Sequence, residues 1–172
     1  MMTHLNIEFK AKASHIKQLE EKLLTLHPTF IGEDHQIDTY YNVLEGRLKL
    51  REGNIENALI WYNREDLAGA KQSDILLYQH EPDEALKKIL LKLHGIKTVV
   101  DKLRKIYFVD NVKFHFDRVE ALGTFIEVEA IDDTGNIGIE KLKNQCNFYI
   151  DFFEIKEEDF MKKSYSDMLM EL

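Results

Sequence analysis

The sequence has one cysteine, two prolines and eight glycines among 172 residues, and it has no long apolar run. The single cysteine, Cys146, excludes a disulfide within the chain, and its place in an apolar helical pattern predicts simple core packing. So few prolines and glycines leave no candidate linker, and we expect one domain over residues 1–172. Because no segment has the length of a membrane span and the N-terminus has no signal-peptide core, we expect a cytoplasmic protein with no membrane partner.

The sequence also has fewer positively charged than negatively charged residues. The chain has 23 lysines and arginines against 31 aspartates and glutamates, which gives a formal net charge of −8 at pH 7. Binding to nucleic acid normally depends on a net basic surface, so we expect no nucleic-acid partner. Any cationic site in this chain must therefore be local.

Alternation of polar and apolar residues predicts a protein built mainly of β-strands. The predicted strands span residues 5–13, 36–42, 47–52, 58–64, 71–78, 99–109, 112–119 and 124–131. Apolar residues at helical spacing predict three helical segments: one capped by Ser14, one from Pro82 to Gly95, and one from Ile139 into the tail.

The stretch GRLKLRE places Arg47, Lys49 and Arg51 on one face of a strand and Leu48 and Leu50 on the other. The same division recurs in other predicted strands. Their polar faces carry Glu8, Lys10 and Lys12; Lys102 and Arg104; Lys113, His115 and Asp117; and Glu127 and Glu129. We therefore expect the apolar faces to pack under helices and the charged faces to point together.

Two arrangements fit these charged faces. About eight antiparallel strands could roll into a barrel with a wet, charged interior, or an open sheet could turn its charged side to solvent. Charges taken out of water cost several kcal/mol each, so a charged interior needs water, mutual pairing or a ligand of opposite sign. The segregation of cations on residues 47–51 from Glu127 and Glu129 favours the barrel.

The two carboxylates of Glu127 and Glu129 converge on one side of a strand, so they suit Mg²⁺ or Mn²⁺. A metal ion beside cations predicts phosphate chemistry.

These residues resemble the CYTH family, the triphosphate tunnel metalloenzymes. The E-x-E-x-K motif of that family appears here as Asn6-Ile7-Glu8-Phe9-Lys10. The segments HQIDTYYNVLEGRLKLRE, DKLRKIYF, KFHFDRVEALGTFIEVE and SYSDM are similar to the class IV adenylyl cyclase branch in particular. The likeness extends over nearly the whole chain.

The resemblance implies an α+β fold: a closed eight-stranded antiparallel β-barrel with helices outside, whose tunnel binds a triphosphate. The implied phosphate-binding residues are Lys10, Lys12, Arg47, Lys49, Arg51, Arg64, Lys71, Lys102, Arg104 and Lys113. The implied metal ligands are Glu8, Glu127 and Glu129, with Asp117 either a further ligand or the partner of a tunnel cation. We expect His115 to be a hydrogen-bonding neighbour, and no residue is assigned as a general base.

The function that the resemblance implies is conversion of ATP to cyclic AMP and pyrophosphate with Mg²⁺ or Mn²⁺. Two alternatives remain open: a triphosphatase acting on thiamine triphosphate or tripolyphosphate, and a nucleotide- or polyphosphate-binding module without turnover. The chain departs from the motif at Asn6, which brings no negative charge where the family has its first glutamate. A homodimer is a further expectation, from the resemblance and from the twofold symmetry usual among soluble oligomers.

Overall fold

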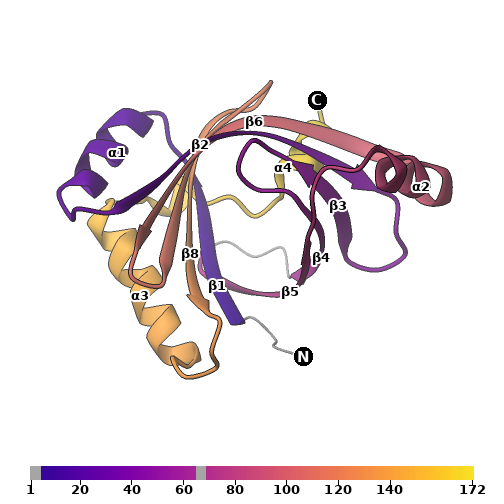
Figure 1. Ribbon diagram of the computed structural model, residues 1–172. Coiled ribbons are helices and arrows are strands. Elements are labelled where there is room, and N and C mark those ends of the chain that lie inside the picture. Colours follow the sequence, from indigo (N-terminus) through magenta and orange to yellow (C-terminus); the bar gives the residue numbers. More distant parts are fainter. Residues whose placement is uncertain (1–4, 65–68) are drawn as a thin grey trace.

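The computed structural model describes residues 5–64 and 69–172, without the side chains of residues 64 and 71–74. Figure 1 shows a strongly curled sheet with α1 (Ile16–Leu24) and α3 (Ile139–Phe152) on its outer side. The elements are β1 (Leu5–Lys12), α1 (Ile16–Leu24), β2 (Thr29–Tyr41), β3 (Arg47–Glu52), β4 (Ala58–Arg64), β5 (Lys71–Gln79), α2 (Glu84–His94), β6 (Ile96–Val109), β7 (Val112–Val119), β8 (Gly123–Asp132), α3 (Ile139–Phe152), the 3-10 turn η1 (Glu157–Asp159) and α4 (Tyr165–Leu169).

All eight strands pair antiparallel in the order β1-β5-β4-β3-β2-β6-β7-β8, and β1 pairs with β8 as well as with β5. The joint between β1 and β5 is short: four residue pairs connect Leu5–Glu8 to Asp74–Lys71, whereas eight pairs connect β1 to β8. Since β5 begins at Lys71, it has no residues left to pair with β1 beyond Glu8. The predicted α+β class and eight antiparallel strands are confirmed. The predicted closure holds only in part, because just four residue pairs join β1 to β5.

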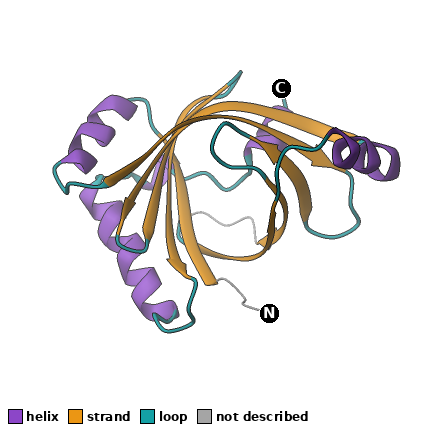
Figure 2. Cartoon of the chain, viewed as in Figure 1, coloured by secondary structure: helices purple, strands orange, loops and turns teal. Residues whose placement is uncertain are grey.

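The apolar face of the sheet carries the main core, on the outside of the curl, where Figure 2 shows α3 lying along the strands. Phe9, Phe114 and Val128 from three strands are fully buried, and they cluster with Leu142 and Cys146 of α3. Alternation across the strands places these side chains outward and their charged neighbours inward. The prediction that Cys146 packs in the core is confirmed, and burial raises the pKa of its thiol to about 12.

Local signals explain most element boundaries. The Asp83 carboxylate caps α2 by accepting from the amide of Ala85, and Gly95 ends the helix with φ of 67°. At α1 the prediction was wrong: His15 occupies the N-cap position instead of Ser14, and no side chain caps the helix. None of the described helices is long and apolar enough to cross a membrane.

Candidate functional site

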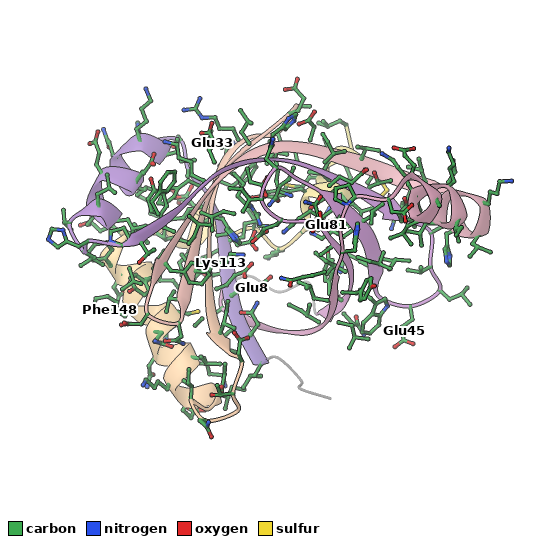
Figure 3. The ribbon with its side chains drawn as sticks, viewed as in Figure 1. Glu8, Glu33, Glu45, Glu81, Lys113 and Phe148 are labelled. Carbon is green, nitrogen blue, oxygen red and sulfur yellow. The ribbon has the colours of Figure 1, made fainter. Side chains whose placement is uncertain are left out.

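The inner face of the sheet encloses a cavity of about 600 Å³. Figure 3 shows Glu8 and Lys113 within the curl, whereas Phe148 lies outside on α3. Six of the predicted phosphate-binding residues line the cavity: Lys10, Lys49, Arg51, Lys102, Arg104 and Lys113. They come from β1, β3, β6 and β7, so the curl brings together cations that are far apart in the sequence.

Asp38 of β2 is the centre of one group of ion pairs. Its carboxylate accepts from Lys102 Nζ at 2.7 Å, from Lys49 Nζ at 2.9 Å and from Arg51 Nε at 2.8 Å. Burial alone would raise the pKa of Asp38, but the charges of Arg51, Lys102 and Lys49 hold it well below its usual range. Three of the six cations are thus already paired to one carboxylate.

A second group is built around Asp117 of β7. Arg104 donates to both oxygens of Asp117, from Nε at 2.7 Å and from a terminal nitrogen at 2.6 Å. The hydroxyl of Tyr165 donates to the same carboxylate at 2.7 Å, and the Lys10 ammonium lies 3.8 Å from the centre of the Tyr165 ring. Of the two roles left open for Asp117, the structure shows the pairing with a tunnel cation.

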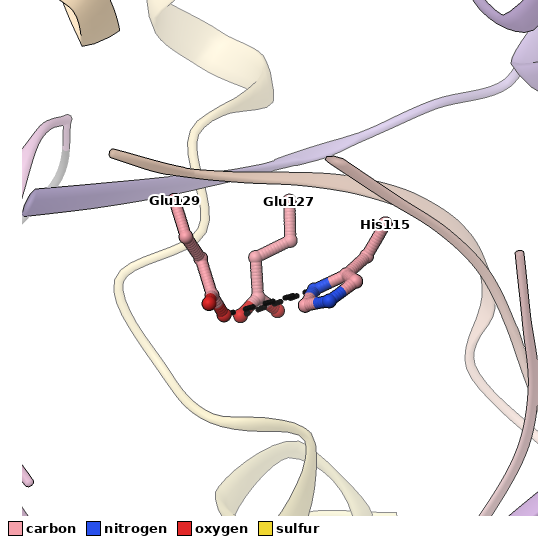
Figure 4. A group of neighbouring side chains, drawn as sticks. All are labelled: His115, Glu127 and Glu129. Atoms are coloured by element: carbon pink, nitrogen blue, oxygen red, sulfur yellow. Dashed lines mark ion pairs between the residues drawn. The ribbon is translucent and has the colours of Figure 1, made fainter. Parts of the chain in front are cut away.

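The acidic cluster of the site consists of His115, Glu127 and Glu129 (Figure 4). One potential ligand atom from each lies within 4.8 Å of the others. Glu127 also pairs with Lys10 at 2.9 Å. Burial raises the pKa of Glu129 well above its usual value, and the neighbouring charges of Glu127 and Glu8 raise it further. Two carboxylates therefore crowd one another where a cation would relieve the repulsion.

His115 supplies the test of whether these residues suit a metal ion. Both of its ring nitrogens are buried without a hydrogen-bond partner among the described residues. Its Nδ1 lies 3.6 Å from a Glu129 oxygen and 3.9 Å from a Glu127 oxygen, too far for hydrogen bonds. Burial, followed by the charge of Arg104, lowers the pKa of His115 to about 3, so the imidazole is neutral and able to ligate. The donor set fits a divalent ion, and His115 lies in it without the hydrogen bond that we expected among the described residues.

The side of the cavity formed by β4 and β5 is apolar. Ala58, Ile60 and Tyr62 of β4 and Ile75 and Leu77 of β5 line it. Strand alternation places Leu59 and Trp61 of β4 on the opposite, outer face. The cavity thus has one charged side and one apolar side.

The other predicted site residues are placed differently. Lys12 is exposed and is not part of the cavity lining. Arg47 pairs with Asp167 of α4 at 2.8 Å. The side chains of Arg64 and Lys71 lie outside the described residues. Glu8 lines the cavity and faces Glu129 across the β1–β8 ladder.

Asn6 lies on the same strand, two residues before Glu8. Its side chain is buried, and its Nδ2 lies 3.5 Å from a Glu8 oxygen. Its Oδ1 has no hydrogen-bond partner in the part of the chain that the structure describes. The amide that replaces the motif's first glutamate therefore still brings an oxygen to the strand position two residues before Glu8.

The residues of the site that were missed in the sequence include Asp38, Glu56 and Tyr165. Asp38 does follow the strand alternation with Gln36 and Tyr40, so its face could have been assigned. Glu56 lies in the turn between β3 and β4, and Tyr165 in the C-terminal tail, where no periodic pattern indicates a direction.

The fold and the cavity define a class of protein: a curled antiparallel sheet around an interior of paired charges with an acidic pocket beside them. A family model described as CYTH domain matches residues 4–165, and the chain belongs to the CYTH family. Enzymes of this triphosphate tunnel family bind triphosphates and depend on divalent metal ions.

Three similar proteins illustrate the relationship. "Putative adenylate cyclase MJ0240" of Methanocaldococcus jannaschii is 25% identical over 177 residues, covering 95% of this chain and 98% of that protein. The solved structure of PH1012 from Pyrococcus horikoshii OT3 superposes with a TM-score of 0.79 at 25% identity, covering 94% of this chain and 98% of the other. HpAC1 from Hippeastrum has a TM-score of 0.63 at 12% identity over 97% of this chain and 94% of its own, and shares the fold.

Proposed function

We propose that this chain is a divalent-metal-dependent enzyme that binds an organic triphosphate in its cavity and converts ATP to cyclic AMP and pyrophosphate. One observation carries the proposal: six lysine and arginine side chains and the cluster of His115, Glu127 and Glu129 line the same cavity. Transfer of a phosphoryl group asks mainly for positioning and charge neutralisation, which such a lining supplies.

The cations would bind the phosphate chain. Arg51 and Arg104 present planar guanidinium groups that can hold two oxygens at once. The ammonium groups act as compact charges, and they belong to Lys10, Lys49, Lys102 and Lys113. Each of the two arginines already holds a carboxylate in this way, which supports a similar grip on phosphate oxygens. Lys12, Arg47, Arg64 and Lys71 remain predicted phosphate contacts.

His115, Glu127 and Glu129 would hold the metal ion, with Glu8 and the Asn6 oxygen beside them. Mg²⁺ or Mn²⁺ bound there supplies Lewis acidity and offsets the negative charge of the triphosphate. We leave Asp117 out of this set, because Arg104 and Tyr165 occupy its oxygens.

In the proposed reaction the ribose 3′-oxygen forms a bond to the α-phosphorus of ATP. The bond from that phosphorus to the oxygen bridging it to the β-phosphorus breaks, and the electron pair leaves with pyrophosphate. The hydroxyl proton passes to solvent, since we assign no general base. The apolar side of the cavity, with Ile60, Tyr62 and Leu77, supports an organic group on the substrate.

A triphosphatase is the second candidate. HpAC1, which shares this fold, is described as having a dominant triphosphatase activity. In that reaction water attacks the terminal phosphorus and orthophosphate leaves, and the same charged lining would serve. Asn6 keeps a third possibility open, a binding module without turnover.

A product screen tests the proposal. ATP, GTP, thiamine triphosphate and tripolyphosphate would be incubated with the protein and Mg²⁺ or Mn²⁺, and every phosphorus-containing product identified. Cyclic AMP with pyrophosphate supports the cyclase, and orthophosphate the triphosphatase. If calorimetry detects binding but no substrate of the panel gives a product, both enzyme hypotheses are rejected and the binding module is retained.

A further inference from the structure

Glu56, in the turn between β3 and β4, has its carboxylate enclosed by three donors. One oxygen accepts from an Arg51 terminal nitrogen at 2.9 Å and from Gln36 Nε2 at 3.1 Å, and the other contacts the Lys113 ammonium. Burial would raise the pKa of Glu56, but the charges of Lys113 and Arg51 hold it well below its usual range. The group is therefore an anion at all ordinary pH values.

The donors around Glu56 are those that would bind a phosphate. A guanidinium, an ammonium and an amide that converge on two carboxylate oxygens have the geometry that also holds two phosphate oxygens. Arg51 and Lys113 both line the cavity, and so does Glu56. A negative side chain of the protein thus stands where a negative group of a ligand would be bound.

Glu56 differs from Asp38, the other carboxylate paired with Arg51. Asp38 lies within β2, and its side chain is 1% exposed, so it cannot leave its cations. The side chain of Glu56 is 24% exposed and projects from a turn whose neighbours Asn54 and Ile55 are exposed. Of these two carboxylates, only Glu56 has solvent to move into.

The backbone of the turn is fixed, so movement falls to the side chain. The buried carboxylate of Asp34 accepts from the amides of Ile55 at 2.9 Å and Glu56 at 3.0 Å. Gly53 and Asn57 are joined by two further hydrogen bonds of 3.0 Å. Rotation about the Glu56 side-chain bonds leaves all of these in place.

We propose that Glu56 is an internal anion that occupies a phosphate subsite made by Arg51, Lys113 and Gln36, and that its carboxylate turns out to solvent when a phosphate chain binds. Glu56 thereby sets the affinity and limits the negative charge that the cavity accepts without metal. This inference rests on the proposed function, because it takes the cavity to bind phosphate.

The test is calorimetric binding of tripolyphosphate and of inorganic phosphate, in EDTA and with Mg²⁺. Glu56→Gln removes the competing charge at nearly constant shape, and we expect about tenfold tighter tripolyphosphate binding, equal to about 1.4 kcal/mol. Glu56→Ala should give a gain of the same sign, and it carries the test if the glutamine variant does not fold. Glu56→Asp retains the charge and should stay much closer to wild type than either.

A matched control separates occupation of a subsite from a general change of charge. Glu81 also lines the cavity but is exposed, so Glu81→Gln removes one negative charge from the same space and should change affinity less than twofold. Equal gains in Glu81→Gln and Glu56→Gln would overturn the inference. Unchanged or weaker binding in the folded Glu56 variants would overturn it as well.

The proposed function and this inference fail in different ways. If neither wild type nor variants bind any triphosphate with Mg²⁺, both fail. If wild type binds and turns over a triphosphate while the Glu56 variants bind no more tightly, only the inference fails.

Discussion

Arg104 and Asp117 face each other across the β6–β7 ladder and share two hydrogen bonds of 2.7 and 2.6 Å. Both side chains are almost completely buried. Removing one partner of such a buried pair costs more free energy than the intact pair contributes to stability. The reason is that the remaining partner is left as an isolated buried charge.

We therefore expect Asp117→Ala to lower the free energy of unfolding by about 3–5 kcal/mol, measured by urea denaturation. The matched control is Glu140→Ala, which removes the exposed partner of Lys143 on α3 and should cost less than about 1 kcal/mol. A loss at Asp117 no larger than that of the control would contradict the role we assign to the pair.

The acidic cluster should bind a metal without substrate. Because Glu127 and Glu129 supply two of its oxygens, we expect Glu129→Gln to weaken Mn²⁺ binding by at least about tenfold in calorimetry. Glu45→Gln, which alters an exposed turn, is the control and should bind as wild type does. Equal affinities in all three proteins would rule out this cluster as the metal site.

His115 should affect which ion is preferred. Imidazole nitrogen suits transition-metal ions better than Mg²⁺, whose preferred ligands are oxygens. We expect wild type to bind Mn²⁺ more tightly than Mg²⁺ and His115→Ala to lose most of that difference. Competition titrations with the two ions measure it, and an unchanged ratio in the variant would mean that His115 is not a ligand.

Asn6 can be returned to the residue of the family motif. Asn6→Glu adds a carboxylate beside Glu8, so we expect tighter Mn²⁺ binding and, without metal, lower stability from like-charge repulsion. Calorimetry and thermal unfolding with and without Mn²⁺ check the two effects. Asn6→Gln is the control, since it adds length without charge.

Asp38 should make the free energy of unfolding depend on pH at acidic pH. Its pKa in the folded protein is lowered, so it contributes stability above its unfolded pKa of about 3.9 and loses that contribution as pH falls through the folded pKa. The difference in unfolding free energy between wild type and Asp38→Asn should be constant between about pH 5 and 7 and shrink below about pH 4. Denaturation curves at pH 7, 5 and 3 test this, and a difference that grows toward acid would contradict it.

Much of the fold could be predicted, because strand alternation is a strong local signal. Arg47–Glu52 and Val112–Val119 were placed with their observed bounds. The start of β2 was missed because Gly32, Glu33 and Asp34 interrupt alternation, and pairing with β6 holds these residues in the sheet. The short joint between β1 and β5 could not be predicted, since it depends on where β5 begins relative to β1.

The sequence predicted which strand faces carry the site residues. It did not predict which of these residues form ion pairs with one another. Strand alternation identified the inward lysines and arginines of β3, β6 and β7 and the glutamates of β8. It could not indicate that Asp38 and Asp117 each hold cations from other strands, because those partners are 11 to 64 residues away in the sequence. The interior is consequently closer to neutral than a count of its cations suggests.

The four-pair joint between β1 and β5 is the shortest ladder described in the ring of strands. Twelve pairs join β2 to β6 on another part of the ring. Amide protons at the joint should consequently exchange with solvent ahead of those in the long ladder. Asn6 and Glu8 lie on that joint, and Glu8 also pairs with Glu129 of the acidic cluster. The acidic cluster therefore adjoins the strand pairing that we expect to open most readily.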